Sequence, residues 1–235
     1  MAKNRLRYIN IYYWLRKLSF SKVFQNFFLI PNYIKRKVIF YFIYKSNHWR
    51  DYQKPLENES ISGLGSDFKI TKNLINELDI FIKKNSIKSI LDVGCGDFNW
   101  IKYLIKNNRN LEYLGLEIVN KIVEKNNEIY SNSKINFICI DVLTKNLPKN
   151  YDLLIIRDFF IHIKNEDISS MLKKIKFSNC KFFAINNFPN VKKNVDVNGY
   201  GHHRMVNIEI KPFDLNNTFY KIDDYDKKLN IYKNI

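Results

Sequence analysis

The sequence contains few cysteines and no long apolar run. Its three cysteines, Cys95, Cys139 and Cys180, are an odd and sparse set, which argues against a disulfide framework and fits a reducing cytoplasm. No stretch reaches 18 apolar residues, so we expect no membrane span. The chain also begins without a long apolar region before a small-residue cleavage site, so we expect no signal peptide and a cytoplasmic location.

Acidic residues are absent from the first 50 positions. This segment holds eleven Lys or Arg and fourteen aromatic residues, and it leaves only +5 of the formal net charge of +16 to the rest of the chain. Three interpretations compete: helices that cap a ligand pocket, a peripheral membrane contact through residues 1–45, and a nucleic-acid surface. We favour the cap and place the membrane second. We place nucleic acid last because no RNA-binding motif is recognisable.

Glycine is also scarce, with seven in the whole chain, yet six of them form three Gly-x-Gly pairs. The pairs are Gly63/Gly65, Gly94/Gly96 and Gly199/Gly201. Glycine is needed where φ is positive or where a ligand lies against the backbone. We therefore treat the three pairs as candidate ligand loops, with ordinary turns as the alternative, above all for the third pair.

Short apolar segments alternate with helical patterns from residue 67 onward. The expected strands are 89–93, 113–118, 135–140, 151–156, 181–185, 206–210 and 229–232, and the expected helices are 67–85, 98–107, 120–130 and 167–175. This alternation predicts an α/β fold with a doubly wound, Rossmann-like and mostly parallel seven-stranded sheet. We assign that domain to residues 59–235 and a basic, aromatic helical extension to residues 1–58.

Four segments at the expected strand ends carry a pattern. They are Leu91-Asp92-Val93-Gly94-Cys95-Gly96, Leu116-Glu117-Ile118, Ile140-Asp141-Val142 and Leu153–Arg157. In order and spacing, over roughly residues 60–190, they resemble the class I methyltransferases that depend on S-adenosylmethionine (SAM). The third glycine common in that family is replaced by Phe98. A dinucleotide site is disfavoured because its Gly-x-Gly-x-x-Gly pattern would need glycine where Asn99 stands.

The resemblance implies SAM as cofactor and S-adenosylhomocysteine (SAH) as product. The implied cofactor-binding residues are Asp92, Gly94, Cys95, Gly96 and Asp97 at the first turn, Glu117 and Ile118 at the ribose, Asp141 and Val142 at the adenine, and Arg157 beside the sulfonium. The segment Ser62-Gly63-Leu64-Gly65-Ser66 resembles a loop that closes over the methionine end in some of these enzymes, which adds Ser62, Gly63 and Ser66. A helix cap at Ser66 or Asp67 is the alternative for this segment.

The candidate catalytic residues follow the fourth strand and the third glycine pair. Asp158 and His162 stand four positions apart, so one helical turn would place them on the same side. A histidine near its ordinary pKa is a suitable general base, and a carboxylate would orient it. The alternative is that Asp158 caps a helix and His162 packs in the core. His202 and His203 form the second candidate cluster. These four side chains also suggest a divalent metal, which we do not favour because no closely spaced ligand motif is present.

The segment Arg157-Asp158-Phe159-Phe160-Ile161-His162 resembles small stand-alone methyltransferases found with bacterial surface-polysaccharide (capsule and lipopolysaccharide) genes. That resemblance implies O-methylation of a small polar acceptor. The expected acceptor is a nucleotide-activated sugar or a precursor of a capsule or surface glycan, including a phosphoramidate-type decoration. The alternatives are an RNA or protein methyltransferase and a non-catalytic partner subunit with the same fold.

Overall fold

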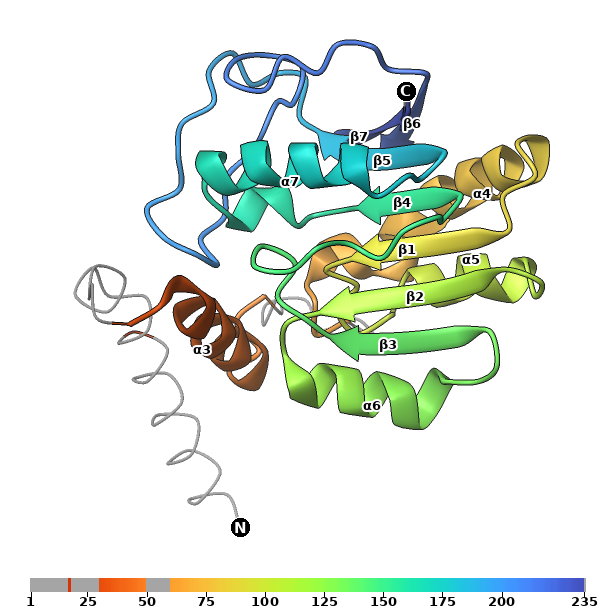
Figure 1. Ribbon diagram of the computed structural model, residues 1–235, viewed down its shortest axis with the longest axis horizontal. Helices are drawn as coiled ribbons and strands as arrows, with labels where there is room; N and C mark the ends of the chain where they lie inside the picture. The colour runs from red at the N-terminus through yellow and green to blue at the C-terminus, as the bar shows by residue number, and fades with distance from the viewer. Residues whose placement is uncertain (1–16, 18–29, 50–59, 235) are drawn as a thin grey trace.

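The computed structural model describes Lys17, residues 30–49 and residues 60–234. Within these ranges one seven-stranded sheet has the order β3-β2-β1-β4-β5-β7-β6 (Figure 1). The strands are β1 Ser89–Val93, β2 Glu112–Glu117, β3 Ile135–Cys139, β4 Leu153–Ile156, β5 Phe182–Asn187, β6 Tyr220–Asp224 and β7 Lys227–Lys233. The first five strands pair in parallel, and β7 is antiparallel to both β5 and β6. The predicted fold class is confirmed.

Helices cover both faces of the sheet. They are α3 Asn32–Lys45, α4 Phe68–Lys84, α5 Ile101–Asn107, α6 Asn120–Tyr130 and α7 Asn165–Phe177, with single turns η1 Leu64–Ser66 and η2 Phe160–His162. Because successive strand side chains point to opposite faces, Leu91 joins the core cluster that includes α3 and α7, whereas Ile90 joins the cluster that includes α4 and α5. Burial on both faces explains the nearly continuous apolar runs in β1 and β4.

The expected strand at 206–210 is wrong. These residues form an irregular segment beside the end of β5, where the Phe188 amide donates to the Val206 carbonyl and the Ile208 amide donates to the side chain of Asn187. Val206 and Ile208 are buried, so the alternation of apolar and polar residues reflects burial without a strand ladder. The missing strand is β6, whose one inward aliphatic side chain is Ile222.

The expected helix 98–107 begins later, at Ile101, because Phe98 has a positive φ of 60°. The expected boundary between residues 58 and 59 lies outside the described residues. So does nearly all of the basic segment before residue 30 on which the membrane interpretation depends. Among Lys17 and residues 30–49 and 60–234, none of the helices is both long and apolar enough to span a bilayer.

The strand order switches direction between β1 and β4. From β1 the chain moves outward to β2 and β3, then returns to the other side of β1 to form β4 and β5. Such a switch point leaves a crevice at the carboxyl ends of the strands. Helix α3 lies at this end of the sheet (Figure 1), and its buried side chains Ile39, Phe40 and Ile43 belong to the core.

Candidate functional site

A cavity of about 850 Å³, including its open mouth, lies at the carboxyl ends of β1 to β4. Twelve of the predicted site residues line it: Ser62, Ser66, Gly94, Cys95, Gly96, Glu117, Ile118, Asp141, Val142, Arg157, Asp158 and His162. The fold therefore brings together the segments on which the sequence resemblance depends.

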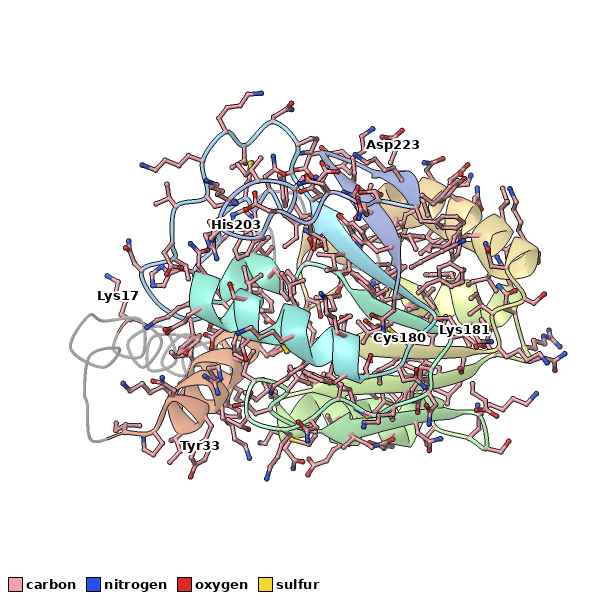
Figure 2. All side chains as sticks on the ribbon, turned by 45° about the horizontal axis from the view of Figure 1, so that its top comes forward. Lys17, Tyr33, Cys180, Lys181, His203 and Asp223 are labelled. Atoms are coloured by element: carbon pink, nitrogen blue, oxygen red, sulfur yellow. The ribbon has the colours of Figure 1, made fainter. Side chains whose placement is uncertain are left out.

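Five predicted site residues do not line the cavity: Gly63, Asp92, Asp97, His202 and His203. Asp92 is buried beneath the glycine turn and accepts a 2.7 Å hydrogen bond from the Tyr113 hydroxyl. Burial raises the pKa of Asp92 to about 7, although the Tyr113 hydrogen bond opposes the rise. Figure 2 shows His203 on a loop well separated from Cys180 and Lys181, which precede β5.

The backbone N–H groups of the glycine turn are engaged within the protein. The amides of Gly94 and Cys95 donate to the Leu116 carbonyl, at 2.8 and 3.1 Å, and the Gly96 amide donates to Oε2 of Glu117 at 3.3 Å. These three amides are therefore not free to bind a ligand directly. What glycine provides is space, because both Gly94 and Gly96 have positive φ and line the cavity.

The carboxylate of Asp97 binds the upstream loop, residues 60–66, to this turn. Ser60 and Ser62 donate their hydroxyls to it, at 2.8 and 3.0 Å, and the Ile61 amide donates at 2.8 Å. The Asp97 amide donates back to Ser62 Oγ. Ser62 is thus committed to fixing the loop, and the next helix is capped by Asp67, whose side chain accepts from the Lys69 amide.

Glu117 stands at the end of β2 as the resemblance implied. Its Oε1 accepts from the amides of Ile118 and Val119, at 2.8 and 3.1 Å. Burial raises the pKa of Glu117, and the three backbone hydrogen bonds that it accepts oppose the rise. These contacts hold a carboxylate in the cavity wall, where it is a suitable acceptor for a diol.

Arg157 joins the elements around the site, β4, β6 and the upstream loop, which we call the frame of the site. Its Nε and Nη2 form a bidentate pair with Asp224 of β6, both at 2.8 Å, and Nη2 also donates to the Gly65 carbonyl at 2.8 Å. Its Nη1 lies 3.2 Å from Oδ2 of Asp158. Arg157 lines the cavity, but its nitrogens serve to join β4, β6 and the upstream loop.

His162 is buried and lines the cavity with Asp158. The orienting group differs from our expectation: Nδ1 donates to the His202 carbonyl at 3.2 Å, and Asp158 is engaged by Arg157 and Lys227. The expected helical turn is absent because Asp158 has a φ of +55° and η2 begins only at Phe160. Burial lowers the pKa of His162 to about 4, below the near-ordinary value that we expected. The ring is therefore neutral at pH 7 but is a weaker base than a free histidine.

Helix α3 and the residues after it supply part of the wall that the sequence did not assign. Trp49, which is half-buried, stacks on the His162 ring with centroids 4.8 Å apart, and Phe40 and Tyr44 pack around Trp49. Arg36 donates to Asp141 at 2.7 Å. The aromatic composition of residues 1–50 was the available signal for this wall, but nothing in the local pattern marked Arg36.

The candidate metal ligands are not gathered in the part of the chain that the structure describes. No three His, Cys, Asp or Glu side chains there form a group suited to a metal ion. The His203 ring centroid lies 6.1 Å from that of His162, and His202 contributes its carbonyl.

Comparison with known proteins finds a family match in the central part of the chain. Residues 90–177 match the family model described as a methyltransferase domain. Over these residues the chain is similar to methyltransferase domains. Its sheet and cavity extend on both sides of the matched residues. The wall formed by α3 and the upstream loop therefore lies outside the matched region.

Two curated relatives are N-methyltransferases. (S)-Coclaurine N-methyltransferase of Thalictrum flavum subsp. glaucum is 25% identical over 137 residues, 54% of this chain and 37% of the relative. Phosphoethanolamine N-methyltransferase of Plasmodium falciparum (isolate 3D7) is 30% identical over 106 residues, 44% of this chain and 38% of the relative. The chain thus spans little more than a third of the length of each relative.

Solved structures match over more of the chain. Magnesium protoporphyrin IX methyltransferase from Synechocystis PCC 6803 with bound SAM has a TM-score of 0.55 and 16% identity, and the match covers 87% of this chain and 96% of that one. PigF with SAH also has a TM-score of 0.55 and 16% identity, over 70% of this chain and 56% of that one. The chain therefore shares the fold of these two proteins, one solved with SAM and the other with SAH.

Proposed function

We propose that this protein binds SAM in the cavity at the carboxyl ends of β1 to β4 and methylates a small acceptor. The observation that carries the proposal is the convergence, in one cavity, of the Gly94–Gly96 turn, two strand-end carboxylates and His162. The residues fit the cofactor: the two glycines leave room for it, Glu117 suits a ribose diol, and Asp141 suits an adenine amino group. SAM supplies an electrophilic methyl group on a sulfonium.

The chain's own contribution to the chemistry is alignment and proton removal. We propose that the acceptor is a small polar molecule with a hydroxyl, such as a nucleotide-activated sugar or a surface-glycan precursor. Nε2 of neutral His162 takes the hydroxyl proton while the oxygen lone pair forms the new O–CH3 bond. The electron pair of the broken C–S bond returns to sulfur. The His202 carbonyl and Trp49 hold the ring for this step.

N-methylation of an amine is the second candidate. The two curated relatives are N-methyltransferases, and Oδ1 of Asp158 is a buried carboxylate oxygen without a hydrogen-bond partner. A carboxylate on the cavity wall is a suitable partner for an ammonium group before it loses its proton. Lys227, 3.5 Å from Oδ1, competes for that charge, so we rank this candidate below the hydroxyl acceptor.

Two experiments test the proposal. Calorimetry with SAM and SAH should give saturable binding, and no detectable heat at high micromolar ligand would contradict it. A screen of nucleotide-sugars, glycan precursors and small amines, read as SAH formation, should then yield turnover above the buffer control. SAH formation with amines alone would replace the hydroxyl acceptor by the amine. Binding without turnover for every acceptor would favour a non-catalytic module.

A further inference from the structure

Arg36 of α3 lines the cavity and joins Asp141, which follows β3, to Tyr200 in residues 199–204, the segment that we call the acceptor loop. Its Nε and Nη2 both donate to Oδ2 of Asp141, at 3.1 and 2.7 Å, and its Nη1 donates to the Tyr200 hydroxyl at 3.0 Å. Its guanidinium carbon also lies 5.0 Å from the centre of the Tyr200 ring. Three segments far apart in the chain thus meet on one side chain.

Arg36 is only 4% exposed, so these are not surface contacts that water would weaken. Oδ1 of Asp141 accepts from the Leu143 amide at 3.0 Å, and Oδ2 takes both nitrogens of Arg36. The carboxylate is therefore fixed in direction, with acceptor capacity left on Oδ1. Removing Arg36 would leave Asp141 held by one backbone amide.

Tyr200 lies between Gly199 and Gly201 in the loop that precedes His202. The Gly201 amide donates to the His162 carbonyl at 3.0 Å, so Tyr200 is attached to the same backbone that orients His162. A second carboxylate, Asp167 of α7, faces this cluster. Burial raises the pKa of Asp167, and the charge of Arg36 opposes that rise.

We propose that Arg36 is a positioning residue that couples the adenine side of the cofactor site to the acceptor loop. This inference rests on the proposed function. By fixing Asp141 and Tyr200 at once, Arg36 makes the docking of α3 favour cofactor binding. By linkage, a bound cofactor then favours the docked α3 and the ordered loop to the same extent.

Arg36→Ala tests the coupling by SAH calorimetry, and Lys37→Ala is the matched control. Lys37 is exposed on the same helix and outside the cavity, so its loss changes the net charge equally. We expect SAH affinity to fall roughly 5- to 100-fold in Arg36→Ala and to change less than about twofold in Lys37→Ala. Arg36→Lys should lie between them, because lysine keeps the charge but not the fork.

The effect of SAH on amide hydrogen exchange in residues 32–45 distinguishes coupling from a merely structural role of Arg36. In the unaltered protein SAH should slow this exchange, and in Arg36→Ala the slowing should be lost. If Arg36→Ala fails to fold, Tyr200→Phe decides. It removes the hydroxyl contacts of Tyr200 to Nη1 of Arg36 and to Asp167 but leaves the Arg36–Asp141 pair in place, so it should raise the acceptor KM more than the SAH Kd.

The outcomes separate the two proposals. An unaltered protein that binds no SAH contradicts the proposed function. An unaltered protein that binds SAH, together with an Arg36→Ala variant of equal affinity and equal protection of α3, overturns the coupling alone. A folded Tyr200→Phe variant with unchanged KM and Kd would also count against it.

Discussion

Nδ1 of His162 lies 3.2 Å from the carbonyl oxygen of His202. Because a carbonyl only accepts hydrogen bonds, Nδ1 carries the proton and Nε2 carries the lone pair. The backbone of the acceptor loop thus selects the tautomer that a general base requires. The aromatic face of Trp49, stacked at 4.8 Å, keeps the ring from turning away.

A pair of substitutions separates the two nitrogens of this ring. In His162→Asn the side-chain amide can take the place of Nδ1, and in His162→Gln it can take the place of Nε2. Neither amide is a base. We expect both variants to lower kcat by about 10²- to 10⁴-fold with the acceptor found by the screen, while SAH affinity changes little. Since burial lowers the pKa of His162 to about 4, the acid limb of kcat/KM in the unaltered enzyme should lie well below pH 6.5. Unchanged turnover in both variants would remove His162 from the chemistry.

Asp92 gives stability a pH dependence of known sign. Its pKa is raised by burial from 3.8 to about 7, so between about pH 4 and 7 the folded state holds a proton that the unfolded chain has released. The free energy of unfolding contributed by this group therefore falls as pH rises through that window and is level above it. Asp92→Asn keeps an acceptor for the Tyr113 hydroxyl and removes the titration.

Urea unfolding at several pH values measures this effect. In the unaltered protein Asp92 lowers the free energy of unfolding as the pH rises from 5 to 8. Asp92→Asn lacks this contribution, so its free energy of unfolding should fall less, or rise more, between pH 5 and pH 8. Asp214→Asn, at an exposed position, serves as the control and should leave the pH dependence as it is. Identical profiles for all three proteins would mean that Asp92 is ionised in the folded state.

The glycine turn can be tested by adding one carbon. A Cβ at Gly96 would lie 2.3 Å from Ser62 Oγ, and the residue has a φ of +56°. Gly96→Ala should therefore displace the upstream loop and cost about 1–2 kcal/mol from the backbone conformation alone. We expect a lower melting temperature and weaker SAH binding. Adding Ser62→Ala should relieve the contact with Oγ, but the backbone strain remains and the hydrogen bonds between Ser62 and Asp97 are lost. Recovery should therefore be partial, and full recovery would contradict the strain argument.

The strands that position the site could be predicted because their burial requires apolar residues that are visible in the sequence. β1 and β4 are buried on both faces and read as apolar runs, and each ends at a residue that lines the cavity or adjoins one that does. β6 could not be predicted. It is fixed by pairing with β7 and by the contact between Asp224 and Arg157, and neither leaves a local apolar pattern.

Contacts between distant residues limited the prediction of the site. The sequence placed Asp141 at the end of a strand, but Arg36 stands 105 positions earlier, and no pattern relates the two. The expected pairing of Asp158 with His162 had a plausible spacing. It was overridden because two cations, Arg157 and Lys227, approach Asp158 and because the His202 carbonyl reaches Nδ1. Tertiary hydrogen bonds, rather than spacing, decided the partners.

The ion pair of Arg157 and Asp224 should be the most sensitive point of the frame. Their side chains are 2% and 0% exposed, and removing one member leaves a buried charge without its bidentate partner. Asp224→Ala should lower the free energy of unfolding by about 3–5 kcal/mol. Because Arg157 also holds the Gly65 carbonyl at 2.8 Å, the upstream loop should loosen and SAH binding should weaken as well.

A matched variant at an exposed ion pair shows whether the stability loss in Asp224→Ala depends on burial of the pair. Lys83 and Asp79 form a pair on α4 at 2.6 Å, with Lys83 63% exposed, and Lys83→Ala should change stability by no more than about 0.5 kcal/mol. Urea unfolding measures both variants. Replacing Arg157 and Asp224 together by Met and Leu should recover much of the stability lost in Asp224→Ala, because both charges of the pair are removed and Asp158 and Lys227, 3.5 Å apart, keep each other as partners. The double variant should still bind SAH weakly, because the contact to the Gly65 carbonyl is gone. Full SAH affinity in it would show that Arg157 does not hold the loop.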